Sequence, residues 1–454
     1  MSSTKRRARK DRQSRSRKGT RVIVVGAGVA GLAAGKALAE AGVPFVILEA
    51  RRRVGGRVWT THPPSLTVPV ELGAEFTHGE AEEVREIVDK EGLRLLDISG
   101  RRFRSTGDRV RVLDDFWERL DHVMRVLDEE REPDRSFAEA VAANRALSDE
   151  DRAIALQFVA SFHAANPAIM SERVLAEGGS PRGEVRERRI GRIADGYDSI
   201  LEVLSRSVRR RIRLGTIVRS IRWSRGRVEV RTAGGKSVTG SAAIITVPLG
   251  VLAAPAGERG RIAFEPSLPP ATRSAIDDLT MGTVSKITLQ FDEPFWTTRR
   301  FASSIGDERL DTMSFLHGTS DVDYPIWWTT YPIRSPLLVG WCGGVKALAL
   351  DELSATDRET AALRSLAKLL SMDPRTLRER LVGSHSHNWT ADPFTRGAYS
   401  YARVGGADAS KRLARPVEGT LYFAGEAADV EGGRTGTVHG AIATGRRAAS
   451  LIIR

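Results

Sequence analysis

The sequence is poor in cysteine and in long apolar runs, and each shortage excludes a class of protein. Cys342 is the only cysteine among 454 residues, so the chain can form neither an internal disulfide nor a zinc site built from several thiolates. No apolar run approaches the roughly 18 residues that a membrane-spanning helix needs. Hydrophobic residues make up 41% and charged residues 28%, which is ordinary for a folded globular chain. The length favours two or three domains, and the single cysteine fits a reducing compartment.

The net charge of +13 is concentrated at the N-terminus. Residues 1–18 contain nine basic side chains and one acidic side chain, Asp11, which gives this segment a net charge of +8. Because it has almost no apolar residues, we expect residues 1–19 to form a disordered basic tail. A solvated extension is the favoured interpretation, although such a tail can also contact nucleic acid or an anionic membrane surface. No cleavage site of an export signal separates the tail from the apolar segment that follows, so we expect a cytoplasmic protein.

A glycine-rich motif follows the tail and predicts a dinucleotide-binding site. Val22–Val25 is a β-branched run typical of a strand that is buried on both faces. Gly26, Gly28 and Gly31 come next in G-x-G-x-x-G spacing, and a helix is predicted at residues 32–41. In this arrangement the glycines allow a tight turn, a close approach of backbone to pyrophosphate, and close packing of helix on strand. The helix N-terminus then faces the phosphates.

The residues after this helix extend the predicted site. A second strand is expected at residues 43–48, and it ends at Glu49, whose carboxylate can accept hydrogen bonds from an adenosine ribose. A glycine pair that includes Gly56 lies between Arg51 and Arg57, which can serve as charge partners for the pyrophosphate. The motif by itself leaves NAD and FAD open.

The C-terminus supplies a second strand and helix of the same kind. Residues 420–423 form a short apolar run that leads to Gly425 and Glu426, and the apolar spacing of residues 437–453 predicts a helix. The N-terminus of such a helix can stabilise negative charge on a reduced flavin ring. Glu426 can bond to a ribityl hydroxyl.

Taken together, these motifs make the sequence similar to the flavin-containing amine oxidase family, which includes monoamine oxidases, polyamine oxidases and lysine-specific histone demethylases. The resemblance is spread over the chain and is carried by residues 22–60, 71–79, 246–252, 282–296, 389–401 and 421–449. Residues 97–190 and 299–380 match less clearly, and substrate specificity is expected to vary there. The ratio of arginine to lysine is typical of a GC-rich genome, so a bacterial source is expected.

The resemblance implies an α/β fold in which a Rossmann-type FAD-binding domain is interleaved with an α+β substrate-binding domain. We expect the FAD-binding domain to comprise residues 20–80, 187–262 and 391–454, and the substrate-binding domain to comprise residues 81–186 and 263–390. FAD is expected to be non-covalent, because the segment that carries a flavin-linked cysteine in some relatives reads Gly397-Ala398-Tyr399 here. The implied cofactor-binding residues are Gly26, Gly28, Ala30, Gly31, Glu49, Arg51, Gly56, Arg57, Gly73, Ala74, Glu75, Phe76, Val218, Gly425, Glu426, Thr437 and Val438.

Lys286 shows how the resemblance changes an interpretation. The period-2 pattern of residues 283–291 places Ile287, Leu289 and Phe291 on one face of a strand and Lys286 on the other, where a solvent-exposed lysine is the usual finding. Relatives carry a lysine four residues after a glycine, as Lys286 follows Gly282. The resemblance therefore implies that Lys286 is catalytic and holds a water near the flavin.

The resemblance also assigns catalytic roles to Tyr399, Trp389 and His78. Tyr399 matches one wall of an aromatic cage whose facing position is Thr437, so the cage is expected to be half built. Trp389 matches a tryptophan near the flavin, and His78 is expected to accept a hydrogen bond from the substrate amine. Glu75 is a further candidate, since an anion near the pocket would attract cationic amines. For the adjacent Trp327 and Trp328 we expect core packing.

The implied reaction transfers a hydride equivalent from the carbon beside a neutral amine to the flavin. The imine product then hydrolyses to a carbonyl, and O2 accepts the electrons to give hydrogen peroxide. No metal-ligand constellation is present, and none is needed. Three alternatives stay open: a flavin-dependent desaturase or isomerase, an L-amino-acid oxidase with Arg434 as a carboxylate ligand, and a nucleic-acid-associated flavoprotein that uses the basic tail. The sequence does not indicate the amine or the oligomeric state.

Overall fold

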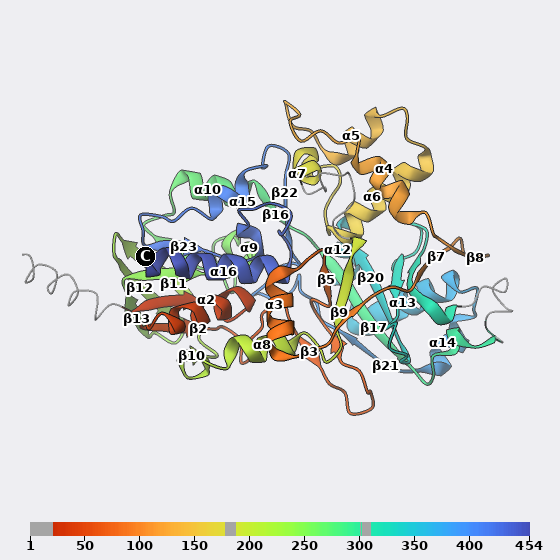
Figure 1. Ribbon diagram of the computed structural model, residues 1–454, viewed down its shortest axis with the longest axis horizontal. Helices are drawn as coiled ribbons and strands as arrows, with labels where there is room; N and C mark the ends of the chain where they lie inside the picture. The colour runs from red at the N-terminus through yellow and green to blue at the C-terminus, as the bar shows by residue number, and fades with distance from the viewer. Residues whose placement is uncertain (1–20, 178–187, 300, 302–309) are drawn as a thin grey trace, which may run out of the picture.

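The computed structural model describes residues 21–177, 188–299, 301 and 310–454. The predicted basic tail, residues 1–19, lies outside the described residues. Figure 1 shows an elongated molecule in which the first and last parts of the chain and residues 198–277 occupy one half, while residues 101–162 and 284–386 occupy the other. No helix of the described part combines the length and apolar character that crossing a bilayer requires.

A five-stranded parallel sheet forms the centre of the first half. Its strands lie in the order β10-β2-β1-β14-β23. Their bounds are β1 Val22–Val25, β2 Phe45–Leu48, β10 Ile212–Arg213, β14 Ala242–Ile245 and β23 Leu421–Phe423. All residues of β1, β2, β14 and β23 are buried, as expected for parallel strands that are covered on both faces. The sequence prediction of a buried strand at β1 is confirmed.

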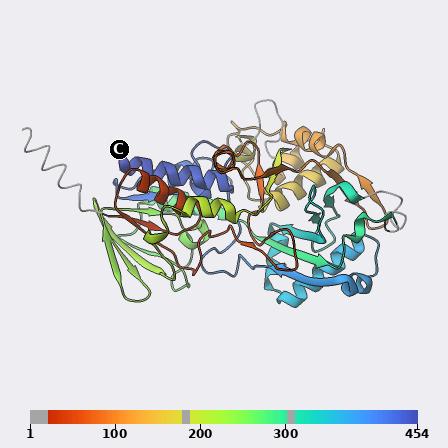
Figure 2. The same cartoon turned by 60° about the horizontal axis from the view of Figure 1, so that its bottom comes forward.

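Two layers cover this sheet. Val22 and Val24 point to one face and pack against helices α2 (Val29–Glu40), α8 (Asp198–Ser205) and α16 (Val438–Ile453). Helices α2 and α16 lie side by side although they come from opposite ends of the chain (Figures 1 and 2). The other face packs against a four-stranded sheet, whose order is β13-β12-β11-β15. The strands of that sheet are β11 Val218–Ser224, β12 Arg227–Thr232, β13 Ser237–Gly240 and β15 Ala263–Glu265.

The second half is built on a seven-stranded mixed sheet in the order β21-β17-β20-β19-β18-β7-β8. The strands are β7 Arg101–Ser105, β8 Val110–Val112, β17 Val284–Phe291, β18 Met313–His317, β19 Ile326–Trp328, β20 Leu337–Gly343 and β21 Leu381–Ser386. One face packs in an apolar core with helices α12 (Val345–Glu352), α13 (Ala355–Leu369) and α14 (Pro374–Arg380). Helices α4 (Phe116–Met124), α5 (Phe137–Ala143), α6 (Asp149–Phe162) and α7 (Glu172–Glu177) form a separate cluster beside the sheet (Figure 1).

A small sheet lies between the two halves. Strand β9 (Ile190–Ile193) pairs on one side with β5 (Phe76–His78) and on the other with β6 (Leu95–Asp97). Helix α3 (Glu82–Glu91) falls in the segment expected to belong to the substrate-binding domain, yet its apolar side chains pack in the same core as α2 and α16. The stretch at 81–91 therefore departs from the expected division, and the domain boundaries stay a prediction.

One local expectation was wrong, and one strand differs from what its pattern alone indicates. The first helix begins at Val29 and not at residue 32, because Gly28 already has the extended conformation of an N-cap and Gly31 lies inside the helix. The pattern of β17 alone would place its polar face in solvent, but every residue of β17 is buried. Its Ile287, Leu289 and Phe291 contribute to the apolar core as predicted. The opposite face, which carries Lys286, forms part of the wall of an internal cavity.

Candidate active site

A cavity of about 1030 Å³ runs from the ends of the parallel strands to the second sheet. This volume lies at the upper end of the range of roughly 300–1,000 Å³ that is usual for a small-molecule pocket. All the site residues that the sequence singled out line this cavity, with the exception of Gly31.

Gly31 acts on the shape of the cavity without lining it. A Cβ atom at Gly31 would lie 2.0 Å from the carbonyl oxygen of Gly26, so only glycine permits this approach of α2 to the end of β1. Gly26 has a φ of +107°, a conformation that side chains other than glycine's rarely adopt. A Cβ at Gly28 would meet nothing closer than 3.9 Å, since Gly28 borders open space. The residues present thus form a backbone-lined cradle at a helix N-terminus, which fits the pyrophosphate of a dinucleotide.

Glu49 closes the far end of this cradle. It is buried, and its carboxylate accepts hydrogen bonds from the Ala27 N–H at 2.7 Å and the Arg51 N–H at 2.8 Å. These two donors fix the carboxylate at the end of β2, where further lone pairs remain for ribose hydroxyls. Arg51 also forms an ion pair of 2.8 Å with Asp392, so its positive charge is partly neutralised although the side chain lines the cavity.

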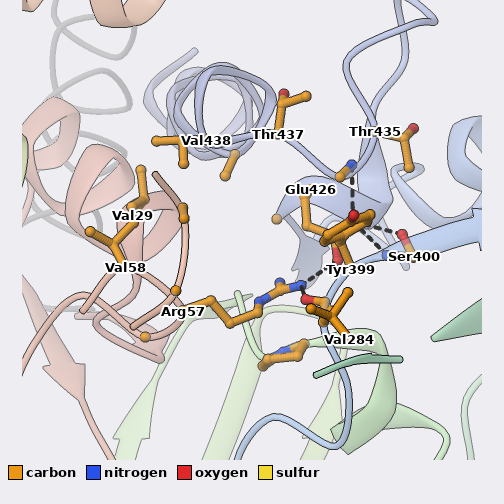
Figure 3. Close-up of a pocket in the computed structure, with 18 of the residues that line it drawn as sticks. Val29, Arg57, Val58, Val284, Tyr399, Ser400, Glu426, Thr435, Thr437 and Val438 are labelled. Atoms are coloured by element: carbon orange, nitrogen blue, oxygen red, sulfur yellow. Dashed lines mark hydrogen bonds and ion pairs between the residues drawn. The ribbon is translucent and has the colours of Figure 1, made fainter. Parts of the chain in front are cut away.

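Glu426 organises the centre of the cavity (Figure 3). One oxygen accepts a hydrogen bond of 2.8 Å from Arg57, and the other accepts bonds from the Ser400 hydroxyl at 2.7 Å and the Gly436 N–H at 3.1 Å. Thr437 caps the N-terminus of α16 by accepting a hydrogen bond of 3.0 Å from the Gly440 N–H. Ser400 and Gly436 were not predicted from the sequence, because neither belongs to a motif with a spacing of its own.

Lys286 and Glu75 form a buried ion pair in the cavity wall. The Lys286 ammonium donates to Glu75 at 2.7 Å and to the Gly73 carbonyl at 3.1 Å. Glu75 also accepts hydrogen bonds from Arg192 at 2.8 Å and from the Trp328 indole at 2.9 Å. Burial raises the pKa of Glu75, but the charges of Lys286 and Arg192 outweigh it and the net shift is downward. The carboxylate is therefore ionised.

These contacts correct the expectation for Glu75. A carboxylate that is already paired with two buried cations is not free to attract a cationic amine, because its charge is more than neutralised within the wall. Arg192 was not predicted from the sequence, since it lies on β9 and no motif surrounds it.

The Trp327 and Trp328 side chains point to opposite sides of β19, as successive strand residues do. Trp327 packs in the apolar core as expected, whereas Trp328 lines the cavity.

Aromatic rings form the wall near Lys286. Tyr399 lines the cavity, and its hydroxyl donates a 2.5 Å hydrogen bond to the Phe162 carbonyl. Burial, with a smaller contribution from Glu426, raises the pKa of Tyr399 well above its usual value, so the phenol is neutral. Trp389 also lines the cavity, and its indole donates to the Leu72 carbonyl at 2.8 Å.

Four histidines in the cavity wall are held neutral. Burial is the main cause that lowers the pKa of His78 to about 3 and those of His163 and His439 to about 4. Burial also lowers the pKa of His317 well below its usual value. The Nδ1 atom of His78 and the Nε2 atom of His163 are buried and have no hydrogen-bond partner among the described residues. Two unpartnered ring nitrogens beside a cavity are suited to bind a ligand or an ordered water. Only His78 was expected from the sequence.

Arg434 and Cys342 were also singled out in the sequence. Arg434, named in the open alternative of an L-amino-acid oxidase, lines the cavity but is ion-paired with Glu83 at 2.8 Å and Glu431 at 2.8 Å, which disfavours it as a carboxylate ligand. Cys342 lies in β20 in the apolar core and does not line the cavity. Burial raises the pKa of its thiol to about 12.

Comparisons with known proteins agree with this geometry. The sequence pattern of the family described as flavin containing amine oxidoreductase matches residues 29–453. The chain is 32% identical to polyamine oxidase 3 of Oryza sativa subsp. japonica over 94% of its own length and 88% of that protein. It is 29% identical to lysine-specific histone demethylase 1 homolog 3 of Arabidopsis thaliana over 95% of its length, which is 30% of that longer protein.

Solved structures share the fold. Wild-type putrescine oxidase bound to putrescine superposes with a TM-score of 0.77 at 23% identity, covering 96% of this chain and 99% of the other. Cyclohexylamine oxidase from Brevibacterium oxydans IH-35A gives a TM-score of 0.77 at 21% identity, covering 96% and 98%. The expected two-domain amine oxidase fold, with a Rossmann-type unit, is thus confirmed. The backbone cradle, the helix N-termini and the paired glycines fit FAD as the cofactor. The chain belongs to the family of flavin-containing amine oxidoreductases and is an FAD-dependent amine oxidase.

Proposed function

We propose that the protein oxidises an amine at the carbon next to nitrogen and uses O2 as the final electron acceptor. In the balanced reaction, one molecule each of amine, O2 and water gives one carbonyl compound, one released amine or ammonia, and one hydrogen peroxide. The C–H bond is broken, the substrate loses two electrons and two protons to form an imine, and water hydrolyses that imine. FAD, which Gly26, Gly28 and Glu49 would hold without a covalent bond, would supply the two-electron redox chemistry that links the substrate to O2. The observation that carries the proposal is the buried Lys286 at the junction of the nucleotide cradle and an aromatic chamber.

Lys286 is proposed to hold the water that takes part in these steps. An ammonium has three N–H donors, and two of those of Lys286 go to Glu75 and the Gly73 carbonyl. Since Lys286 lines the cavity, the third donor is available to a water molecule there. Glu75 and Arg192 fix the ammonium in place, because a buried pair with several hydrogen bonds leaves few alternative positions.

The neutral wall is proposed to keep the substrate amine deprotonated. A buried cation is costly when it has no anionic partner, and Glu75 is already occupied by two cations. The unpartnered Nδ1 atom of His78 is able to accept a hydrogen bond from the amine N–H without giving it a proton. Tyr399 and Trp389 then orient the amine by contact with its apolar part. These three residues and Lys286 are the proposed catalytic residues.

The proposed cofactor contacts follow the predicted list of seventeen residues. Gly26, Gly28 and Ala30 would lie against the pyrophosphate, and Glu49 would bind the adenosine ribose. Val218, at the start of β11, lines the cavity on the nucleotide side, where we propose contact with the adenine. Val438 opens α16, whose N-terminal N–H groups would stabilise negative charge on the flavin.

An anaerobic stopped-flow screen of purified protein against primary, secondary, polyamine and amino-acid substrates tests the proposed reaction. Loss of flavin absorbance identifies the substrate class without assuming an electron acceptor, and hydrogen peroxide is then measured on adding O2. Lys286→Met should keep FAD bound while slowing flavin reoxidation or carbonyl release by about tenfold or more. Lys236→Met, on an exposed β-hairpin, is the matched control and should behave as wild type. Wild-type rates of both half-reactions in Lys286→Met would remove Lys286 from the proposal.

The role of residues 1–18 and the cytoplasmic location remain predictions. Deleting the tail tests the first of these. Unchanged amine turnover together with loss of salt-sensitive DNA binding would identify the tail as a nucleic-acid-binding element, whereas an unchanged weak affinity would identify it as a solvated extension.

A further inference from the structure

Arg102 is a cavity-lining arginine with an unusual environment. It lies on β7, between β18 and the edge strand β8 of the seven-stranded sheet, and is partly buried. Among the other arginines of the cavity wall, Arg57, Arg188 and Arg434 each form an ion pair with a carboxylate. No carboxylate of the described residues forms an ion pair with Arg102. Burial alone lowers its pKa to about 9, with no acidic group offsetting that effect.

The groups around the Arg102 guanidinium are aromatic and neutral. Its central carbon lies over the rings of Phe315 at 4.3 Å, Phe116 at 4.7 Å and Trp117 at 4.8 Å. One terminal nitrogen lies 3.1 Å from Nε2 of His317, and because His317 is neutral, this nitrogen is the donor. His317 is the only hydrogen-bond acceptor of this guanidinium in the described part of the chain. The remaining donors of the planar fork are therefore available to a ligand.

A series of aromatic contacts links Lys286 to Arg102 along the cavity wall. The Lys286 ammonium lies 5.6 Å from the Trp328 ring centre, and the rings of Trp328 and Phe315 are 6.2 Å apart. The Arg102 guanidinium in turn lies over the Phe315 ring. Trp328, Phe315 and Arg102 all line the same cavity. An aromatic wall thus leads from the proposed site of oxidation to a cation that is unpaired among the described residues.

We infer that Arg102 is a specificity-determining residue that binds an anionic group, most simply a carboxylate, at the end of the substrate distant from the oxidised amine. This inference rests on the proposed function, because it assigns the far end of the same substrate. A guanidinium fork binds a carboxylate through two parallel hydrogen bonds, and the aromatic cage holds the fork in one orientation. A second ammonium at this place would meet a fixed positive charge in a low-dielectric chamber. The preferred substrates are therefore amino acids or other amines with an acidic group, and diamines are disfavoured.

A matched set of three amines tests this assignment. Hexylamine, ε-aminohexanoate and hexanediamine share one alkyl chain and differ only in the distant group, and the same triplets are built on butyl and octyl chains. In anaerobic flavin reduction by the wild-type holoenzyme, the amino acid of at least one triplet should half-saturate at a concentration about tenfold below that of the alkylamine. The diamine should require the highest concentration. A diamine that saturates at the lowest concentration in every triplet would overturn the assignment.

Variants of Arg102 identify the residue responsible. Arg102→Gln should abolish the preference for the amino acid over the alkylamine. The alkylamine concentration that half-saturates flavin reduction should change by less than about twofold. Arg102→Lys keeps the charge without the fork and should retain part of the preference. Arg101→Gln, on the opposite face of the same strand, is the control and should match wild type, because Arg101 is exposed and does not line the cavity. An unchanged preference in Arg102→Gln would refute the role of Arg102.

Failure of the proposed function gives a different result. If no amine of any class reduces the flavin, oxidation of amines is refuted. The anion site is then tested by the binding of hexanoate, which has no nitrogen and cannot be oxidised as an amine. Hexanoate should perturb the flavin absorbance of the wild-type holoenzyme and should do so at about tenfold higher concentration in Arg102→Gln. Equal binding to both proteins, or no binding to wild type, would overturn the anion site. If Arg102→Gln does not retain FAD, the same comparison is made with Arg102→Lys.

Discussion

Replacing Glu75 by glutamine should destabilise the protein strongly. Glu75 is 8% exposed and pairs with Lys286, which is 5% exposed, and with Arg192, which is 9% exposed. Glutamine keeps the shape and an acceptor for Trp328 but leaves two buried cations without an anion. Removing one partner of a buried ion pair costs about 3–5 kcal/mol, and we expect a loss of that size here.

A double-mutant cycle separates this electrostatic effect from packing. In Lys286→Met the Glu75 carboxylate keeps Arg192 as a partner, so the expected loss is smaller, about 1–3 kcal/mol. The double variant Glu75→Gln/Lys286→Met has a single unpaired cation, and it should be more stable than the sum of the two losses by about 1–3 kcal/mol.

The measurement is equilibrium urea unfolding of the FAD-loaded proteins at neutral pH, followed by tryptophan fluorescence. The free energies of unfolding are compared only between variants whose free energy depends on urea concentration with the same slope. Flavin content is measured on the same samples, so that a loss of cofactor is not counted as a loss of the ion pair. A Glu75→Gln variant within about 0.5 kcal/mol of wild type, or additive single changes, would refute the reasoning. Because the pKa of Glu75 is lowered in the folded protein, the stability it contributes is present above the unfolded value near 4.5 and is lost as the pH falls through the folded value.

Three other predictions concern the cofactor cradle and the chamber. Gly31→Ala should yield protein with little or no FAD by absorbance, since its Cβ would lie 2.0 Å from a carbonyl oxygen, whereas the control Gly234→Ala, where a Cβ meets nothing within 4 Å, should bind FAD normally. Tyr399→Phe should lower the free energy of unfolding by about 1–3 kcal/mol, because a buried carbonyl loses its 2.5 Å hydrogen bond, and a change below about 0.3 kcal/mol would contradict this. His78 has a folded pKa of about 3 against 6.5 in the unfolded chain, so its contribution to stability is complete above pH 6.5 and decreases as the pH falls toward 3. Urea unfolding of His78→Leu between pH 6.5 and 5 should therefore show a pH dependence that is shallower than that of wild type by up to about 1.4 kcal/mol per pH unit, and equal slopes would be evidence against a buried neutral imidazole.

The cofactor side of the site was predictable because its residues follow one another along the chain. Gly26, Gly28 and Glu49 lie within one strand–helix–strand unit, where local spacing fixes the geometry. Thr437 was predicted for a similar reason, since the helix it caps has a clear apolar period. Their roles toward FAD remain proposals.

The substrate side could not be predicted in the same way. Arg102 and Arg192 come from two different sheets, and their environments depend on strand pairings that have no local signal. The alternation of polar and apolar residues in β17 indicated a solvent-exposed Lys286, which is in fact buried. A polar face of a strand can border either solvent or an internal cavity, and the pattern does not distinguish the two. Likewise Glu75 was expected to be available to a ligand, whereas two cations far away in sequence neutralise it.

The packing of α2 against α16 has a consequence for the order of events during synthesis. The nucleotide cradle begins with β1 at residue 22, but the helix that closes it begins at Val438. At a translation rate of roughly 5–20 residues per second, about 20 to 80 s pass between the two. Throughout this interval the exposed apolar face of α2 lacks its neighbour, so a nascent chain depends on chaperones or on provisional contacts. Ribosome stalling or a nonsense codon late in the message would release a nearly complete polypeptide that cannot retain its flavin.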